Sequence, residues 1–240
     1  MNKITLVDYG LGNIYSAQKA LEKCGAAVQL SSDPREILNA EKLVLPGVGA
    51  FGKGMEALRE RGLVEPIQEY ARLKKPLLGI CLGMQMLFDV GVEFGSCTGL
   101  GLIPGTVELI RGKELDGTKL RVPHVGWNEL LPGPLVYPKS ALADAPWSRT
   151  LFDGLTQSDA FVYFVHSYVA IPRSPSHILA QFIYGDQKLV AAVQSGSIWG
   201  CQFHPERSGE VGLNIIRNFV DYPGLGRPFS PHSSADLPGS

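Results

Sequence analysis

The residues best suited to covalent chemistry form the segment Gly79-Ile80-Cys81-Leu82-Gly83, between an apolar run at 77–80 and a stretch at 84–88 with helical character. A nucleophile flanked by glycines at a strand-to-helix turn is strained and exposed, because the glycines leave room for the tight backbone. The Cys81 thiol then lies at a helix N-terminus, which favours the thiolate, and the Leu82 N–H points to where an oxyanion forms. Free cysteine is often buried and inert. The glycines and the strand-to-helix context favour a nucleophile here.

A thiol nucleophile needs a base, and the sequence favours His204 among the five histidines. It follows an expected strand over 198–203 and precedes Pro205-Glu206. In an extended chain positions i and i+2 face the same side, so Glu206 is expected beside the His204 ring, where it can fix the tautomer. His124 and His166 flank strands and are expected to be structural histidines with satisfied hydrogen bonds. His177 and His232 are expected at the surface.

The elements that must position these groups follow an alternating pattern in the first hundred residues. Short apolar runs at 4–7, 27–30, 42–45 and 77–80 predict strands. Between them, helices are expected after Asn13, after the N-cap Asp33, and over 53–61 and 63–73. Alternating strands and helices predict a parallel, doubly wound sheet.

The pattern changes after Gly91, where short alternating segments predict a β-rich second half. Strands are expected over 107–110, 119–122, 161–165, 178–183, 189–194 and 198–203, followed by a helix over 209–220. Residues 132–150 predict a long surface loop, and the Pro/Gly/Ser-rich tail 223–240 an extended or disordered appendix. The fold class is therefore α/β, with one domain over 1–222 and a mostly parallel doubly wound sheet.

Composition excludes several classes of function. The 240 residues carry 22 Lys+Arg and 23 Asp+Glu, a net charge of −1, so nothing in the charge favours a nucleic-acid or membrane-surface partner. The four cysteines are far apart without a Cys-x-x-Cys pair, which indicates free thiols in a reducing compartment and no metal site. The longest apolar run, 76–88, is too short to span a bilayer. A cytoplasmic protein without metal or cofactor is expected.

Two segments resemble the signatures of class I, triad-type glutamine amidotransferases: 79–85 and 203–206. The resemblance implies that Cys81, His204 and Glu206 form a catalytic triad that hydrolyses the side-chain amide of L-glutamine through a Cys81 thioester and releases ammonia. Further segments are similar to the glutaminase subunits of imidazole glycerol phosphate synthases, and the similarity extends over about 2–221. These segments are Asp8-Tyr9-Gly10-Leu11-Gly12-Asn13, Pro46-Gly47-Val48-Gly49, Pro123-His124-Val125-Gly126-Trp127-Asn128 and Tyr163-Phe164-Val165-His166-Ser167-Tyr168.

The same resemblance implies roles for further residues. Val48, in the loop with Gly47, and Leu82 would form the oxyanion hole. In the resting chain we expect the carbonyl of the Gly47–Val48 peptide to point into the site and to flip when a partner docks. The residues implied to surround the substrate are Gly49, Gln85, Glu93, Ser167 and Tyr168.

The implied partner is a (β/α)8-barrel cyclase subunit in a heterodimer. It would take up the ammonia and make imidazole glycerol phosphate and AICAR in histidine biosynthesis. Trp127, Tyr163 and Arg207 would face it. An ordinary packing role for Trp127 is the alternative, and Arg207 departs from the lysine frequent in the family, which puts a specific ion pair there in doubt.

Other functions fit parts of the sequence. Gly10-x-Gly12 after the first strand suggests dinucleotide binding, although the third glycine of that fingerprint would fall at Tyr15. A cysteine peptidase or hydrolase could use the same nucleophile turn. A non-enzymatic regulator would be expected to lack one of the three triad residues. A paralogous glutaminase that supplies ammonia for sugar amidation in surface polysaccharide synthesis has nearly the same pattern.

Overall fold

The computed structural model describes residues 2–136, 145–156, 158 and 160–223, and its centre is an eight-stranded sheet. The strand order is β2 (Ala26–Ser31), β1 (Asn2–Val7), β3 (Leu43–Leu45), β4 (Leu77–Ile80), β14 (Ile198–Cys201), β13 (Gln187–Ser195), β12 (Ile178–Tyr184) and β9 (Leu131–Pro132). The first five strands are parallel and the last three pair antiparallel. Four of the seven pairings are thus parallel, which confirms the mostly parallel sheet.

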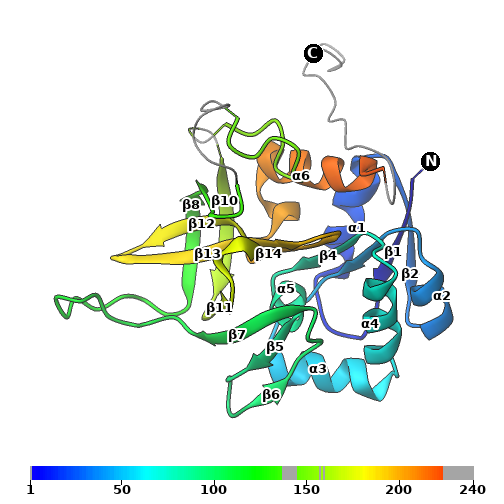
Figure 1. The fold of residues 1–240 in the computed structure, drawn as a ribbon, viewed down its shortest axis with the longest axis horizontal. Coiled ribbons are helices and arrows are strands. Elements are labelled where there is room, and N and C mark those ends of the chain that lie inside the picture. The colour runs from blue at the N-terminus through cyan, green and yellow to red at the C-terminus, as the bar shows by residue number, and fades with distance from the viewer. Residues whose placement is uncertain (1, 137–144, 157, 159, 224–240) are drawn as a thin grey trace.

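Helices cover both faces of this sheet, as a doubly wound fold requires (Figure 1). On one side α1 (Ile14–Lys23) packs against α6 (Gly209–Asp221). On the other lie α2 (Pro34–Asn39), α3 (Phe51–Glu60), α4 (Val64–Arg72) and the short α5 (Leu82–Met86). The expected start of α2 is confirmed, because Asp33 Oδ1 accepts hydrogen bonds from the N–H groups of Arg35 and Glu36.

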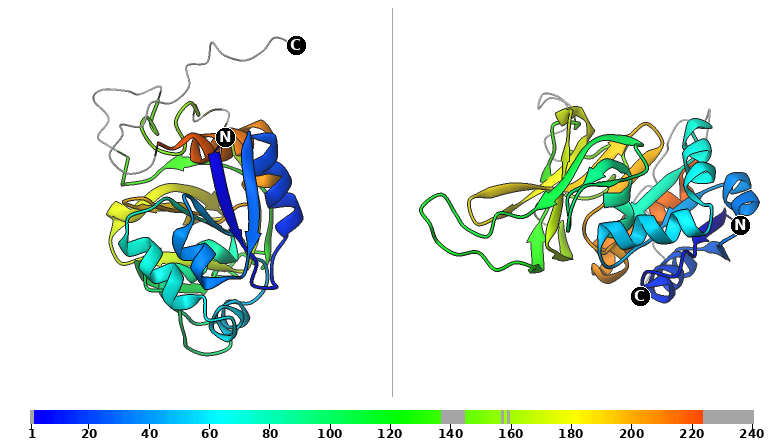
Figure 2. Two further views of the ribbon diagram at one scale, coloured as in Figure 1. Left: turned by 90° about the vertical axis from the view of Figure 1, so that its right-hand side faces the viewer. Right: turned by 90° about the horizontal axis from the view of Figure 1, so that it is seen from below.

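The second half of the chain adds two smaller sheets, which confirms its β-rich character (Figure 2). One pairs β8 (His124–Glu129) with β10 (Phe161–His166) antiparallel. The other has the order β11 (Tyr168–Pro172), β7 (Ile103–Leu109), β5 (Phe88–Gly91) and β6 (Cys97–Thr98). Two 3-10 turns, η2 (Pro175–His177) and η3 (Pro205–Arg207), complete the described elements.

Three local predictions are wrong. Residues 119–122 form no strand: they lie in an arm between β7 and β8 whose two limbs meet in a single bridge, Lys113 to Lys119. The Arg121 carbonyl accepts its hydrogen bond from the Tyr184 hydroxyl, a side chain, and so does not continue a ladder. The helix expected over 84–88 ends at Met86, and Phe88 already begins β5 by pairing with β7.

The third wrong prediction is the surface position of the loop expected over 132–150. Its described part contributes to the core, since Trp147 is fully buried and its Nε1–H donates to the carbonyl of Leu179. Residues 137–144 and nearly all of the predicted tail lie outside the described residues.

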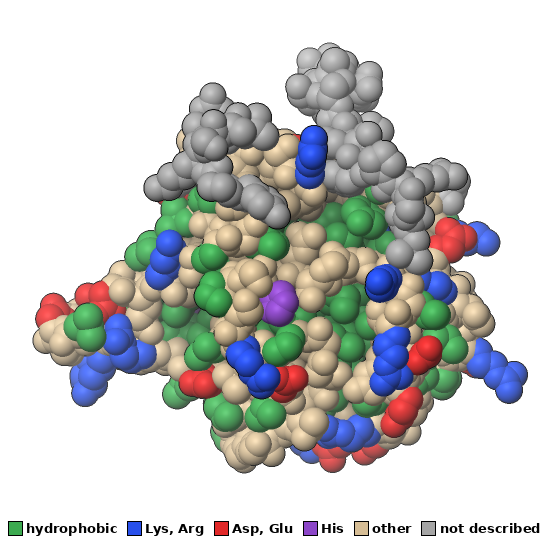
Figure 3. All heavy atoms as spheres, in the orientation of Figure 1, with side chains coloured by type: hydrophobic (Ala, Val, Ile, Leu, Met, Phe, Trp, Pro, Cys, Tyr) green, Lys and Arg blue, Asp and Glu red, His purple; other side chains and the backbone are tan. Residues whose placement is uncertain are grey.

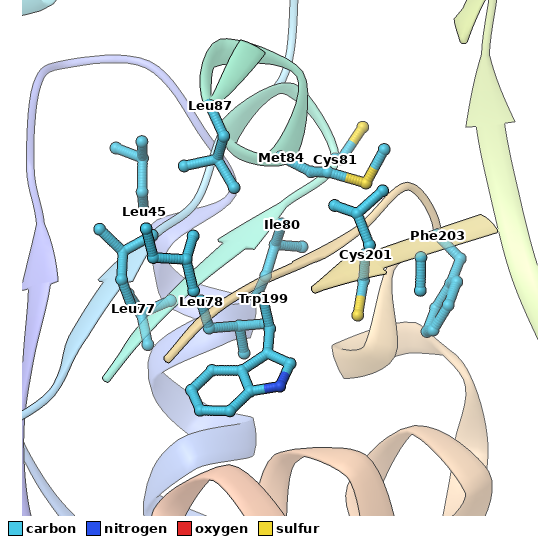
Figure 4. Close-up of a cluster of buried hydrophobic side chains, with 14 of the residues drawn as sticks. Leu45, Leu77, Leu78, Ile80, Cys81, Met84, Leu87, Trp199, Cys201 and Phe203 are labelled. Atoms are coloured by element: carbon cyan, nitrogen blue, oxygen red, sulfur yellow. The ribbon is translucent and has the colours of Figure 1, made fainter. Parts of the chain in front are cut away.

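The core forms around strands that are buried on both faces (Figure 4). All residues of β4 and β14 are buried, and Leu77, Leu78 and Trp199 are among the side chains that fill the centre. Such continuous apolar runs are typical of parallel strands covered by helices. Because β1, β3, β4 and β14 are parallel, the loops that follow them emerge at one edge of the sheet, where open α/β folds bind ligands.

The face shown in Figure 3 carries acidic and basic side chains interspersed among apolar and polar ones. None of the helices in the described part of the chain is long and apolar enough to cross a membrane.

Candidate active site

Cys81 lies in a strained turn between β4 and α5, with φ +54° and ψ −111°. Both flanking positions require glycine because other backbone atoms lie where a side chain would begin. A Cβ on Gly83 would lie 1.8 Å from the carbonyl oxygen of Leu45, and one on Gly79 would lie 2.8 Å from the backbone of Gly83. The Cys81 N–H donates to the carbonyl of Cys201 at 2.7 Å, which fixes the turn to β14. The predicted nucleophile turn is thus confirmed as a backbone conformation.

His204 and Glu206 form a buried pair, with Nδ1 of the ring 2.8 Å from Oε1 of the carboxylate. The predicted proximity is confirmed, but the reason given for it is wrong. The strand ends at Cys201, and residues 205–207 form the turn η3 instead of continuing as an extended chain. His204 precedes this turn with φ −99° and ψ 94°, and the turn holds the Glu206 carboxylate against its ring.

The surroundings of His204 favour the protonated ring. Burial lowers the pKa of His204, but hydrogen bonding and charge interaction with Cys81 and Glu206 outweigh it and raise the pKa to about 10. His204 Nε2 is buried, and the ring lines the same cavity as Cys81. A charged imidazole facing a thiol can stabilise the thiolate and later protonate a leaving group.

The loop after β3 lies against the nucleophile turn. The Leu82 N–H donates to the carbonyl of Gly47 at 3.3 Å, so the Gly47–Val48 peptide points its oxygen at the donor of the predicted oxyanion hole. This confirms the carbonyl-inward orientation expected for the resting chain. In this state the Leu82 N–H is already hydrogen-bonded to the loop.

Tyr9 holds this loop in place through its hydroxyl group. The sequence analysis did not predict this role. Its hydroxyl donates to the Pro46 carbonyl at 2.7 Å, and a Cβ on Gly47 would lie 2.3 Å from it. Burial and then the nearby Cys81 raise the pKa of Tyr9, so it remains a hydroxyl donor. The signal in the sequence was a tyrosine two residues after a buried strand, because a buried tyrosine hydroxyl usually has a hydrogen-bond partner.

A cavity of about 280 Å³ unites the predicted substrate and oxyanion residues. Its volume lies at the lower end for small-molecule sites, which suits an amino acid better than a polypeptide segment. Its lining includes Cys81, His204, Val48, Gly49, Leu82, Gln85, Glu93, Ser167 and Tyr168.

A polar network forms one wall of this cavity. Gln85 Nε2 donates to the carbonyl of Tyr168 and to Oε1 of Gln202, both at 3.0 Å. Gln202 Nε2 lies 3.9 Å from the Cys81 sulfur. The network fixes Gln85 and connects it to the nucleophile. Gln202 was not predicted, because only the tertiary contact distinguishes it from other glutamines at strand ends.

His166 also lines the cavity, and the prediction that it is a fully satisfied structural histidine is wrong. Nδ1 lies 2.9 Å from the Tyr168 carbonyl, but Nε2 is buried and has no hydrogen-bond partner among the described residues. Burial lowers the pKa of His166 to about 4, so the ring is neutral at neutral pH. With Nδ1 donating its proton to Tyr168, Nε2 is an unprotonated acceptor.

Glu93 lines the cavity and is held in place by the start of α3. Its Oε2 accepts a hydrogen bond from the Phe51 N–H at 2.8 Å. Ala50, at the N-cap position, cannot cap this helix with its side chain. Glu93 supplies that cap, and the anchor places a carboxylate on the cavity wall.

The predicted partner-facing residues lie outside the cavity, on the outward face of the β8–β10 sheet. Trp127 is 55% exposed and pairs in register with Tyr163. The Arg207 guanidinium lies 4.8 Å from the centre of the Tyr163 ring. We call the exposed residues Val125, Trp127 and Phe161 together with Tyr163 the apolar face.

The apolar face adjoins the cavity. Val165 pairs with Val125 on the outward side of the same two strands and also lines the cavity, as does Pro123 just before β8. Within the described residues, no group of three His, Cys, Asp or Glu side chains could hold a metal ion.

Comparison with known proteins gives one family. Residues 5–222 match the family Glutamine amidotransferase class-I. The chain is 44% identical over 220 residues to the imidazole glycerol phosphate synthase subunit HisH 1 of Legionella pneumophila (strain Lens), covering 92% of this chain and 99% of that protein. It is 43% identical to the subunit HisH of Synechococcus sp. (strain JA-3-3Ab), covering 92% and 94%.

Among solved structures, PurLQS from Thermotoga maritima matches with a TM-score of 0.65 at 22% identity, covering 92% of this chain and 98% of that one. A structure titled glutamine amidotransferase matches with a TM-score of 0.62 at 18% identity, covering 90% and 97%. These structures share the fold.

Proposed function

The chain belongs to the class I glutamine amidotransferases, and from this premise we propose that it is the glutaminase subunit of an imidazole glycerol phosphate synthase in histidine biosynthesis. The observation that carries the proposal is the buried His204–Glu206 pair on the same small cavity as the strained Cys81. The cavity volume supports glutamine as the substrate over a peptide.

In the proposed reaction the Cys81 sulfur attacks the amide carbon of glutamine and forms a tetrahedral oxyanion. When the C–N bond breaks, His204 gives its proton to the nitrogen, and ammonia leaves. Water, deprotonated by His204, then attacks the Cys81 thioester and releases glutamate with the thiol restored. Glu206 holds the ring and stabilises its charge through the 2.8 Å contact.

We place substrate recognition at the two ends of the cavity. The Glu93 carboxylate, fixed by the Phe51 N–H, is suited to the ammonium group of glutamine. Gln85, Gly49 and the Ser167–Tyr168 segment line the remaining wall around the amino acid head. Asparagine, which is one methylene shorter, would not bring its amide to Cys81 while holding these contacts.

The oxyanion hole is incomplete in the resting chain, because the Leu82 N–H is taken by the Gly47 carbonyl. A flip of the Gly47–Val48 peptide would free this donor and turn the Val48 N–H inward. One oxyanion donor is worth about 10²–10³ in rate, so the flip can switch activity by that factor or more. Val48→Pro removes the N–H and is expected to abolish stimulation by the partner while leaving association intact.

The partner is proposed to be a (β/α)8-barrel cyclase that docks on the apolar face and receives ammonia. The apolar face supports this, since an exposed aromatic cluster with an adjacent arginine has the composition of an interface core. Val165 and Pro123 connect it to the cavity, so ammonia could leave Cys81 without entering bulk water. The products would be imidazole glycerol phosphate and AICAR.

The test is glutamine turnover by the chain alone and with the cyclase subunit. Activity should require the partner, and Cys81→Ser should lose it while binding the partner normally. Trp127→Ala should weaken partner binding without changing the fold. A glutamine analogue with a reactive diazoketone should label Cys81 and spare Cys24, Cys97 and Cys201. Unchanged turnover in Cys81→Ser would overturn the proposal.

A further inference from the structure

Ser208 occupies the N-cap position of α6, but its side chain does not cap the helix. A serine at this position normally accepts a hydrogen bond from the backbone two or three residues further on. Here the residue is 1% exposed, and its hydroxyl is directed away from the helix. Departures from local preference concentrate at functional sites, so the contacts that replace the cap are informative.

The Ser208 hydroxyl connects two separate elements. It accepts a hydrogen bond from the Tyr163 N–H in β10 at 3.0 Å and donates to the carbonyl of His204 at 2.7 Å. The His204 N–H donates in turn to the Tyr163 carbonyl at 3.0 Å. The N–H and the carbonyl of Tyr163 are therefore both bonded to the segment 204–208: the carbonyl to the backbone of His204, and the N–H to the side chain of Ser208.

The remaining hydrogen bonds of this segment do not attach it to the sheet. The Arg207 N–H donates to the His204 carbonyl and the Ser208 N–H to the Pro205 carbonyl, both within the turn. The Gly212 N–H donates to the Ser208 carbonyl, which joins the turn to α6 only. Apart from the Arg207 guanidinium over the Tyr163 ring, the contacts that hold His204 to β10 are thus its own N–H and the Ser208 hydroxyl.

We propose that Ser208 is a positioning residue for His204: its hydroxyl fixes the turn to β10, so that the ring stays beside Glu206 and toward Cys81. The inference rests on the proposed function, in which His204 transfers the proton. Proton transfer requires accurate placement, and a displacement of about 1 Å can lower a rate about 10²-fold.

The test compares Ser208→Ala with the unchanged chain, each in complex with the cyclase partner. We expect kcat for glutamine to fall about 10- to 100-fold with KM unchanged, because the cavity wall that binds the amino acid head is not altered. We also expect the pKa of His204, followed by NMR of the labelled ring, to fall from its raised value toward the ordinary one as the Glu206 contact loosens. Ser208→Thr keeps the hydroxyl and should restore both.

Ser31 offers a matched control. It is also buried, and its hydroxyl likewise accepts a backbone N–H, that of Asp33 at 3.0 Å, and donates to Glu36 at 2.6 Å. It does not line the cavity. Ser31→Ala should lower stability without changing kcat or the pKa of His204.

Several results would overturn the inference. One is an unchanged kcat and His204 titration in Ser208→Ala, and another is the same two changes in Ser31→Ala. If Ser208→Ala does not fold, Ser208→Cys, whose thiol is somewhat larger than the hydroxyl and donates only weakly, takes its place with the same expectation. The proposed function fails separately, through retained turnover in Cys81→Ser. Wild-type behaviour of Ser208→Ala beside an inactive Cys81→Ser rejects only the role of Ser208.

Discussion

Replacement of His166 by asparagine should make the stability of the protein less sensitive to acid. Burial, with smaller effects from the charges of His124 and His204, lowers the pKa of His166 to about 4 from its ordinary 6.5, against the opposing hydrogen bond to Tyr168. The unfolded chain therefore takes up a proton below about pH 6.5, whereas the folded protein resists it down to about pH 4. The unfolded state binds more protons between these values, so the free energy of unfolding falls as the pH is lowered through this window.

The magnitude follows from the two pKa values. One pKa unit corresponds to about 1.4 kcal/mol, and between pH 7 and pH 5 the difference in protonation amounts to about 2 kcal/mol. Asparagine cannot be protonated, but its side-chain N–H can still donate to the Tyr168 carbonyl. Between pH 7 and pH 5 the unchanged protein should therefore lose about 2 kcal/mol more stability than His166→Asn.

Urea denaturation of both proteins at pH 7, 6 and 5 measures this difference. The comparison cancels the contributions of the other titrating groups, including the His204–Glu206 pair. Gly52→Ala, which changes no titrating group, serves as the control and should show the same pH dependence as the unchanged protein. Parallel pH dependences for His166→Asn and the unchanged protein would show that His166 can be protonated in place, and would refute the neutral acceptor in the cavity.

Four further outcomes can be measured directly. Gly83→Ala places a Cβ 1.8 Å from the Leu45 carbonyl and should lower the free energy of unfolding by about 3 kcal/mol or more, seen as a lower thermal midpoint. Gly52→Ala, in α3 with open space around it, should raise stability by about 0.5–1 kcal/mol. In steady-state assays with the partner, Glu206→Gln should retain more activity than loss of the His204 ring, which costs about 10²–10⁴-fold. Glu93→Ala should raise KM for glutamine at constant kcat if the carboxylate contributes uniform binding, and a selective fall in kcat would assign it another role.

Local geometry made much of the site predictable. The nucleophile turn depends on glycines within two residues of Cys81, and the cap of α2 depends on Asp33 and the next three residues. The parallel order of the first strands follows from alternating apolar periods along the chain. In each case the relevant atoms are close in sequence, so residue type and spacing carry the information.

The contact between His204 and Glu206 was predicted correctly from their spacing, but for the wrong structural reason. Their separation of two residues predicted the contact, but the chain makes it through a 3-10 turn after β14 has ended. The strand stops early because the turn is bonded to β10, a partner 41 residues earlier in the chain than His204. Distant pairing of this kind leaves no local signal.

The sequence by itself determined the alternation of strands and helices as far as β4, the strained cysteine turn and most of the residues that meet at the cavity. The tertiary structure decided how those residues are used. It placed Tyr9 beneath the loop at Gly47, joined Gln202 to Gln85, left one nitrogen of His166 unpaired and turned the Ser208 hydroxyl away from its helix. The physical reason is that hydrogen-bond partners at a sheet edge come from different loops. Their distances depend on the packing of the whole sheet, whereas strand and helix periods depend on the nearest neighbours.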